Sequence, residues 1–208
     1  MFHPKLNEDG IPLRLKNPSQ GTSPESWNLP EAFAQVVPDG TMPSELGKVP
    51  FSAWSDAPTA NEAWETLAST MAFDEPIFEP MAGKKSAAGV VLVEPDGRVW
   101  AFAPSNAYGA YKATFPKGQA DGLSLKATAI KEALEETGLK VELTGFLIDI
   151  SRTTSFTRFY LARRTGGNPA DMGWEAQAVM LMPKHLLATH LTAHTDAPIL
   201  DHLIKTLG

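Results

Sequence analysis

Apolar and polar positions follow different patterns on the two sides of Lys84-Lys85. Beyond this point, apolar runs bounded by turn residues predict a series of short strands. The predicted strands cover residues 88–94, 98–103, 112–115, 140–150, 157–162 and 176–181. The first two flank Pro95-Asp96-Gly97, which is a turn sequence, and they are therefore expected to form a hairpin.

Two helices are predicted among these strands. The first covers residues 125–137, with Ser124 as its N-cap and Gly138 as its C-terminal stop. The second covers residues 197–207, and Pro183 is expected to open a shorter helical turn before it. The inner side of the second helix carries Ile199, Leu200, Leu203 and Ile204. Strands with few helices between them predict an α/β (α+β) fold, in which a mixed central sheet carries helices on its faces.

Residues 1–85 are predicted to form a Pro-rich N-terminal extension to a main domain at 86–208. The extension holds 11 of the 17 prolines. Because proline fixes φ and removes a hydrogen-bond donor, mostly extended chain and turns are expected there. One short helix is predicted at 59–71, capped by Thr59 or Asn61. The extension is too apolar for a free tail, and we expect it to pack on the main domain. Its apolar residues include Trp27, Phe33, Val36, Val37, Phe51, Trp54, Trp64, Leu67, Phe73, Ile77 and Phe78.

Composition narrows the classes of function. The formal net charge of −6 argues against a protein that binds nucleic-acid polymers, since such proteins usually carry a basic face. The lack of cysteine excludes disulfides, thiolate metal sites and cysteine nucleophiles. The N-terminus has no apolar run of signal-peptide length, and no run is long enough to span a membrane. We therefore expect a cytoplasmic protein with no membrane partner. The oligomeric state stays open, with a homodimer among the alternatives.

Three carboxylates gather on one side of the first predicted helix. Glu132, Glu135 and Glu136 follow the spacing i, i+3, i+4 and repel one another. A divalent cation would neutralise them, and hard oxygen ligands suit Mg²⁺ or Mn²⁺. The alternative is a solvated acidic helix face, which is common in proteins.

The loop before this helix favours the metal interpretation. Residues 114–122 lead from a predicted strand through a glycine-containing turn into the helix. Such a turn lets backbone groups approach phosphate oxygens, and Lys117 adds a positive charge. The loop and the carboxylates together predict a site for a phosphate and a metal ion.

The segment from Gly118 to Val141 resembles the Nudix box, whose pattern is G-x(5)-E-x(7)-R-E-U-x-E-E-x-G-U with U a bulky aliphatic residue. Glu132 matches the first glutamate of the helix, and Glu135 and Glu136 match the paired glutamates. Gly138 matches the terminal glycine and Leu139 the final aliphatic residue. The resemblance extends from about Ser86 to the C-terminus and implies a Nudix-like α/β/α sandwich.

The segment departs from the pattern in four ways. Lys131 stands in place of the arginine, and Ala133 in place of the bulky aliphatic residue. The loop is one residue shorter than in the family. The first box glutamate is missing, because its position falls on Leu123. The nearby carboxylate of Asp121 is a weak candidate for a partial substitute.

The resemblance implies roles for particular residues. The metal ligands would be Glu132, Glu135, Glu136 and the backbone of Gly118. The general base varies in the family, so Glu135, Glu132 and Glu175 are all candidates. Glu175 lies just before the predicted strand at 176–181, where many relatives place a catalytic glutamate on a loop.

Substrate contacts are predicted from charged and aromatic residues near the box. The candidates are Lys117, Tyr108, Tyr111, Lys112, Arg152 and Arg158. Arginine suits phosphate because its guanidinium group donates two parallel hydrogen bonds. The alternative for each is an ordinary surface or edge-strand residue. Trp54 is either a platform for a base or a core residue, and core packing is favoured.

The resemblance implies a Nudix-type hydrolase that uses Mg²⁺ or Mn²⁺ to cleave a diphosphate linkage. The substrate would be a small molecule with a nucleoside diphosphate linked to another group, or a related polyphosphate. The alternative is a Nudix-fold module that senses a nucleotide with weak or no catalysis. The missing box glutamate and Lys131 favour this alternative, whereas the intact Glu132, Glu135 and Glu136 oppose it.

Overall fold

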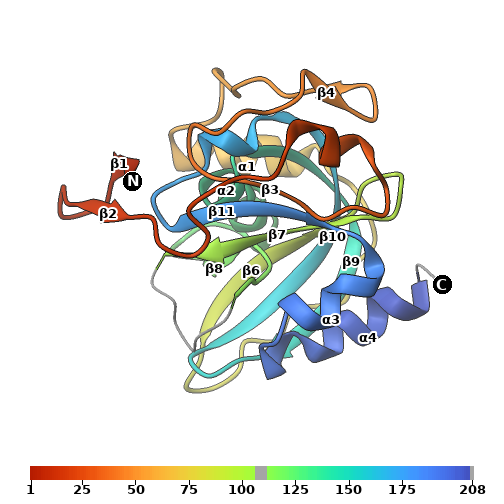
Figure 1. Ribbon diagram of the computed structural model, residues 1–208. Helices are drawn as coiled ribbons and strands as arrows, with labels where there is room; N and C mark the ends of the chain where they lie inside the picture. The colour runs from red at the N-terminus through yellow and green to blue at the C-terminus, as the bar shows by residue number, and fades with distance from the viewer. Residues whose placement is uncertain (106–111, 207–208) are drawn as a thin grey trace.

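Two β-sheets form the centre of the protein (Figure 1). The computed structural model describes residues 1–105 and 112–206. The larger sheet has the order β8-β6-β10-β9, and the smaller has the order β3-β11-β7. Their strands are β3 (Ala34–Val36), β6 (Lys85–Leu92), β7 (Val99–Pro104), β8 (Lys117–Gln119), β9 (Leu139–Ser151), β10 (Ser155–Gly167) and β11 (Ala176–Met182). Strands β6 and β10 are parallel, and the other pairs in both sheets are antiparallel, so the larger sheet is mixed.

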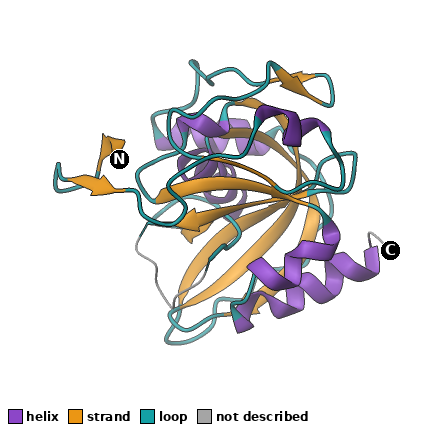
Figure 2. Cartoon of the chain, in the orientation of Figure 1, coloured by secondary structure: helices purple, strands orange, loops and turns teal. Residues whose placement is uncertain are grey.

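Helices cover both faces of the strands (Figure 2). Successive side chains of a strand point to opposite faces, so each sheet contributes to two cores. On β6, Val90 packs in the core with α1 (Asn61–Ser69) and α2 (Leu125–Thr137). Its neighbour Val91 packs in the core with α3 (Leu187–His190) and α4 (Ala197–Thr206). Short 3₁₀ helices cover Pro24–Asn28, Pro169–Asp171, Lys184–Leu186 and His194–Asp196. The predicted mixed sheet with helices on its faces is confirmed.

The turn after β6 forms, but the strands that it joins do not pair as a hairpin. The Glu94 backbone N–H donates to the Arg98 carbonyl oxygen at 2.9 Å, which closes the turn. Beyond a single bridge between Val93 and Val99, β6 and β7 enter different sheets. The hairpin prediction is therefore wrong, because turn residues specify a chain reversal without specifying the partners of the strands. No strand forms at the predicted residues 112–115, where only Thr114 makes a single β-bridge, to Phe102. The strand lies a few residues later, at β8.

The ends of α2 follow the sequence prediction. The Ser124 hydroxyl oxygen accepts a hydrogen bond from the Ala127 backbone N–H at 3.2 Å. Gly138 ends the helix with a φ of 69°, a conformation that glycine adopts without strain. The bounds and both caps of this helix are confirmed. In α4, Ile204 is 47% exposed, so its predicted inward orientation is wrong.

The N-terminal extension packs on the sheets and adds small sheets of its own. Strand β3 pairs with β11, and separate pairs form between β1 and β2 and between β4 and β5. Their bounds are β1 (Phe2–Leu6), β2 (Pro12–Arg14), β4 (Glu45–Leu46) and β5 (Val49–Pro50). Trp27 is fully buried, whereas Ile77 is 88% exposed and does not pack as expected. Helix α1 is shorter than predicted, and its N-cap is Ala60 rather than Thr59 or Asn61.

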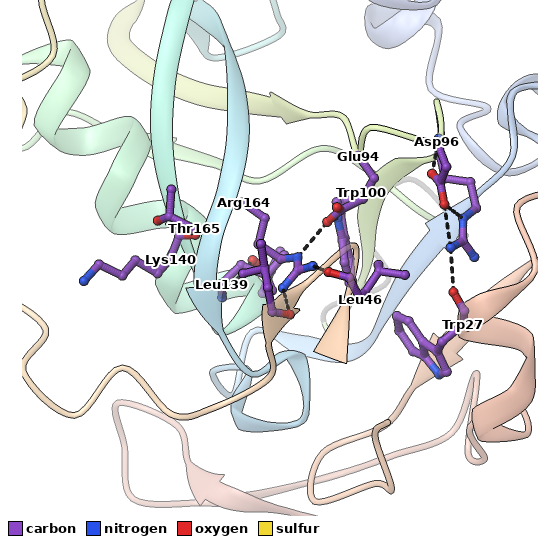
Figure 3. Close-up of polar contacts among 12 residues, drawn as sticks. Trp27, Leu46, Glu94, Asp96, Trp100, Leu139, Lys140, Arg164 and Thr165 are labelled. Atoms are coloured by element: carbon purple, nitrogen blue, oxygen red, sulfur yellow. Dashed lines mark hydrogen bonds and ion pairs between the residues drawn. The ribbon is translucent and has the colours of Figure 1, made fainter. Parts of the chain in front are cut away.

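Buried arginines tie the extension to the main sheets, and Figure 3 labels one of them, Arg164. The Arg164 guanidinium group donates to Glu94 Oε1 and to the Leu46 carbonyl oxygen, both at 2.6 Å. The Trp100 indole N–H donates to the same Glu94 oxygen at 2.8 Å. Arg98 donates to the Trp27 carbonyl oxygen at 2.6 Å. These contacts join residues far apart in the sequence, so the extension is part of the packed structure.

Within the described residues, none of the helices combines the length and the apolar character needed to cross a membrane.

Candidate metal and catalytic site

Three glutamates converge beside the second half of α2. One carboxylate oxygen from each of Glu132, Glu136 and Glu175 lies within 4.8 Å of the other two. Glu132 and Glu136 are one helical turn apart on α2, and Glu175 comes from the loop before β11. Glu136 is buried, with 6% of its surface exposed. A helix and a loop that are distant in sequence thus meet at one acidic cluster.

Strand β8 fixes the two helix glutamates. The Glu136 carboxylate accepts a hydrogen bond from the Lys117 backbone N–H at 2.6 Å. A side chain at Gly118 would occupy the position of the Glu132 carboxylate, so only glycine fits there without displacing it. The Pro-Lys-Gly segment therefore lies directly against the cluster, although Lys117 and Gly118 belong to strand β8 rather than to the expected turn.

The Glu175 loop is held from two sides. The Gly173 backbone N–H donates to the Glu135 carbonyl oxygen at 2.7 Å, which joins the loop to α2. The Ser105 backbone N–H donates to the Glu175 carbonyl oxygen at 2.7 Å, which joins the loop to the end of β7. These backbone contacts place Glu175 opposite the helix glutamates.

Burial and mutual repulsion favour the protonated forms of these carboxyl groups. Burial, together with the negative charge of Glu135, raises the pKa of Glu132 to about 7. Burial also raises the pKa of Glu136, although the nearby positive charge of Lys117 opposes this change. The pKa of Glu175 is raised by burial, then by the charges of Glu135 and Glu8. A bound divalent cation would reverse this preference by neutralising the ionised groups.

The donor set fits a hard cation. Three carboxylates supply oxygen ligands, and Mg²⁺ and Mn²⁺ prefer such ligands. In the described part of the chain, no lysine, arginine or histidine side chain forms a salt bridge with any of these three glutamates. Once its carboxyl groups ionise, the cluster carries negative charge that a divalent ion would compensate.

Glu135 is not one of the three grouped glutamates, although its charge acts on Glu132 and Glu175. Its carboxylate forms an ion pair with Lys131 Nζ at 2.7 Å, on the more exposed side of α2. The assignment of Glu135 as a metal ligand or base stays a prediction, because helical spacing alone does not distinguish which of the neighbouring glutamates would bind the cation. The structure groups Glu175 with Glu132 and Glu136 instead.

The predicted substrate residues lie in different places. Lys117 is close enough to affect the pKa values of Glu132, Glu136 and Glu175. Lys112 is exposed. Tyr108 and Tyr111 fall outside the described residues.

The two predicted arginines are engaged in structural contacts. Arg158 is 2% exposed and forms paired hydrogen bonds with Asp149 at 2.8 and 2.7 Å. It also donates to Glu75 at 3.0 Å, which fixes a segment of the extension on β10. Arg152 forms an ion pair with the buried Asp196 at 2.6 Å, beside α4. Neither arginine joins the glutamate cluster, because each guanidinium group is occupied by its own carboxylate.

Trp54 packs as a core residue. Its ring meets Trp64 edge-on with centroids 5.8 Å apart, and Lys140 Nζ lies 4.7 Å from its ring centroid. The favoured interpretation of this tryptophan agrees with these contacts.

One carboxylate near the start of α2 was not anticipated from the sequence. Glu65 of α1 accepts a hydrogen bond from the Ser124 backbone N–H at 2.6 Å. A negative charge at a helix N-terminus is favourable because of the helix dipole. Glu65 thus brings an acidic group close to Leu123, where the box glutamate is missing. Its distance in sequence from the box gave no signal for this contact.

Comparisons with known proteins agree with this architecture. A NUDIX domain model matches residues 83–203. RNA pyrophosphohydrolases from two strains of Caulobacter vibrioides are each 37% identical over 92 residues, which is 43% of this chain and 50% of the relative. This chain therefore spans about half the length of the curated relatives it matches.

A solved structure supports the fold. A NUDIX hydrolase from Nitrosomonas europaea matches with a TM-score of 0.51 and 19% identity, over 60% of this chain and 73% of that chain. This likeness concerns the fold alone. Because the domain model covers more than half of the sequence, the chain belongs to the NUDIX domain family.

Proposed function

We propose that this protein is a pyrophosphohydrolase that uses Mg²⁺ or Mn²⁺ to cleave a diphosphate linkage. The observation that carries the proposal is the convergence of Glu132, Glu136 and Glu175 beside Lys117 and Gly118 of β8. Membership of the NUDIX family supports the same chemistry.

Each part of the site has a role in this proposal. Glu132 and Glu136 hold the cation, with the Gly118 backbone alongside. When bound, the cation neutralises the diphosphate and lowers the pKa of a water molecule. Glu175 faces the two helix glutamates from its loop and accepts the proton of the attacking water. Its raised pKa suits this role, because a base works best with a pKa near the working pH. Lys117 attracts the substrate phosphate.

The substrate is proposed to be a nucleoside diphosphate-linked or related polyphosphate compound. The similarity to RNA pyrophosphohydrolases adds RNA with a 5′-polyphosphate end to the candidates. The acidic net charge favours small molecules over a polymer, because polymer binding usually needs a basic face. A panel that contains both classes separates these alternatives.

The test compares three glutamine variants on that panel, with Mg²⁺ present. We expect Glu136→Gln to lower kcat by at least about 100-fold, because a buried ligand of the cation is lost. Glu135→Gln should retain most activity, since that side chain is paired with Lys131 outside the cluster. Glu142→Gln is the control, because Glu142 is exposed and pairs with Arg163 on the sheet edge. Binding of a diphosphate without turnover by the unmodified protein would instead support a sensor module.

A further inference from the structure

Strand β11 contains a β-bulge immediately after Glu175. Ala176 lies opposite Pro104 and Ala178 lies opposite Ala103, so Gln177 is the extra residue on β11. A bulge bends its strand and changes the direction of nearby side chains, and bulges are frequent next to active sites. The direction of Glu175 therefore depends on how this bulge is held.

The Gln177 side chain connects the bulge to the N-terminal extension. Its Oε1 accepts hydrogen bonds from the backbone N–H groups of Lys16 at 2.8 Å and Asn17 at 3.1 Å. Its Nε2 lies 3.3 Å from the Arg14 carbonyl oxygen and 3.5 Å from that of Ser105. Gln177 is 7% exposed, so these contacts are largely shielded from water. Removing the carboxamide would leave the two extension N–H groups without this acceptor, which carries a desolvation cost.

The same contacts lead back to Glu175. The Ser105 backbone N–H donates to the Glu175 carbonyl oxygen at 2.7 Å, while the Ser105 carbonyl oxygen faces the Gln177 amide. The β1–β2 pair also approaches this loop, because Lys5 Nζ donates to the Asp171 carbonyl oxygen. The extension, the end of β7 and the Glu175 loop thus form one hydrogen-bonded unit.

We infer that Gln177 is a positioning residue, which directs Glu175 toward the helix glutamates by fixing the bulge to residues 14–17 of the extension. This inference rests on the proposed function of Glu175. Among the described residues, the hydrogen bonds of the Gln177 side chain go to backbone groups of residues 14–17 and Ser105, so its effect passes through the backbone. Through Gln177, residues 14–17 of the extension would also affect catalysis, although these residues lie outside the stretch matched by the NUDIX model.

The test uses Gln177→Met, which keeps the length of the side chain and removes its hydrogen bonds. We expect kcat to fall about tenfold or more while KM changes less than about twofold, because small displacements of a reacting group lower the rate strongly. Gln177→Glu retains the acceptor for the two N–H groups, and it should recover part of the lost kcat.

The matched control is Gln35→Met. Gln35 also joins parts of the extension, through Nε2 to the Gln20 carbonyl oxygen at 2.8 Å, but it lies on β3 away from the bulge. We expect this control to leave kcat within about twofold of the unmodified protein, since the side-chain amide of Gln35 donates to Gln20 within the extension. Equal losses in both methionine variants would overturn the inference, because they would reflect general loosening of the extension.

Two further measurements keep the test independent of turnover. The Mn²⁺ affinity of the substrate-free protein, followed by electron paramagnetic resonance, should change little in Gln177→Met and in Gln35→Met, because Glu132 and Glu136 hold the cation. Amide hydrogen exchange at Ser105 should accelerate in Gln177→Met alone, because this N–H is bonded to Glu175. Absence of turnover in the unmodified protein rejects the proposed function, whereas unchanged exchange at Ser105 rejects the positioning role. Should Gln177→Met fail to fold, Gln177→Asn, one methylene shorter, serves in the same comparison.

Discussion

At the scale of single residues, the carboxyl group of Glu132 makes metal-free stability depend on pH. Its pKa is about 7 in the folded protein and 4.5 in its ordinary state. Between these values the folded protein holds a proton that the unfolded chain has released, so raising the pH favours unfolding. The contribution of this group is favourable near pH 4.5 and is lost as the pH rises through about 7.

This dependence is measurable by urea denaturation with a chelator present. We expect Glu132→Gln to be more stable than the unmodified protein at pH 8, with the difference shrinking toward pH 4.5, because glutamine mimics the neutral carboxyl group. Adding Mg²⁺ at pH 8 should stabilise the unmodified protein and leave the variant nearly unchanged. A variant that is less stable at every pH would contradict the burial of an ionisable group at this position.

At the scale of elements, the close approach of β8 to α2 is set by Gly118. An added methyl group would displace the flexible end of Glu132, while the backbone of Gly118 needs no unusual φ. We therefore expect Gly118→Ala to fold normally and to lower kcat on the order of 100-fold through the misplaced carboxylate. Thermal unfolding tests whether the variant folds normally, and steady-state kinetics measures the loss of kcat.

Gly145→Ala is the control for this substitution. Gly145 lies on β9, and a methyl group there would meet no atom within 4 Å. Its kcat and Tm should match those of the unmodified protein. Equal kcat values for Gly118→Ala and Gly145→Ala would show that Glu132 needs no fixed position.

Elements differ in how far the sequence predicts them. Both ends of α2 were predicted, because Ser124 and Gly138 satisfy the helix termini with local contacts. The hairpin was wrong, because the division of β6 and β7 between two sheets depends on long-range partners. The box glutamates were identified from their spacing, yet the grouping of Glu175 with Glu132 and Glu136 arises from packing. The same limit applies to Arg158, whose partners Asp149 and Glu75 lie on other elements.

At the scale of the whole molecule, the buried pair of Arg164 and Glu94 joins the extension to both sheets. Arg164→Met would leave Glu94 as a buried charge that has lost its guanidinium partner. Such a change typically costs about 3–5 kcal/mol of the free energy of unfolding. Urea denaturation at neutral pH measures this difference.

The neighbouring Arg163 supplies the comparison. Its ion pair with Glu142 is exposed, and pairs of this kind contribute about 1 kcal/mol or less. Arg163→Met should therefore change the free energy of unfolding only slightly. Similar losses for Arg163→Met and Arg164→Met would mean that the extension adds little to the stability of the sheets.

The pairing of β3 with β11 has a consequence for how the chain can be shortened. The NUDIX match begins at residue 83, yet residues 34–36 satisfy the outer edge of β11. A protein trimmed to the matched stretch would expose a bare strand edge, and such edges readily recruit another molecule. The stretch matched by the NUDIX model is therefore shorter than the stretch needed to keep the edge of β11 covered.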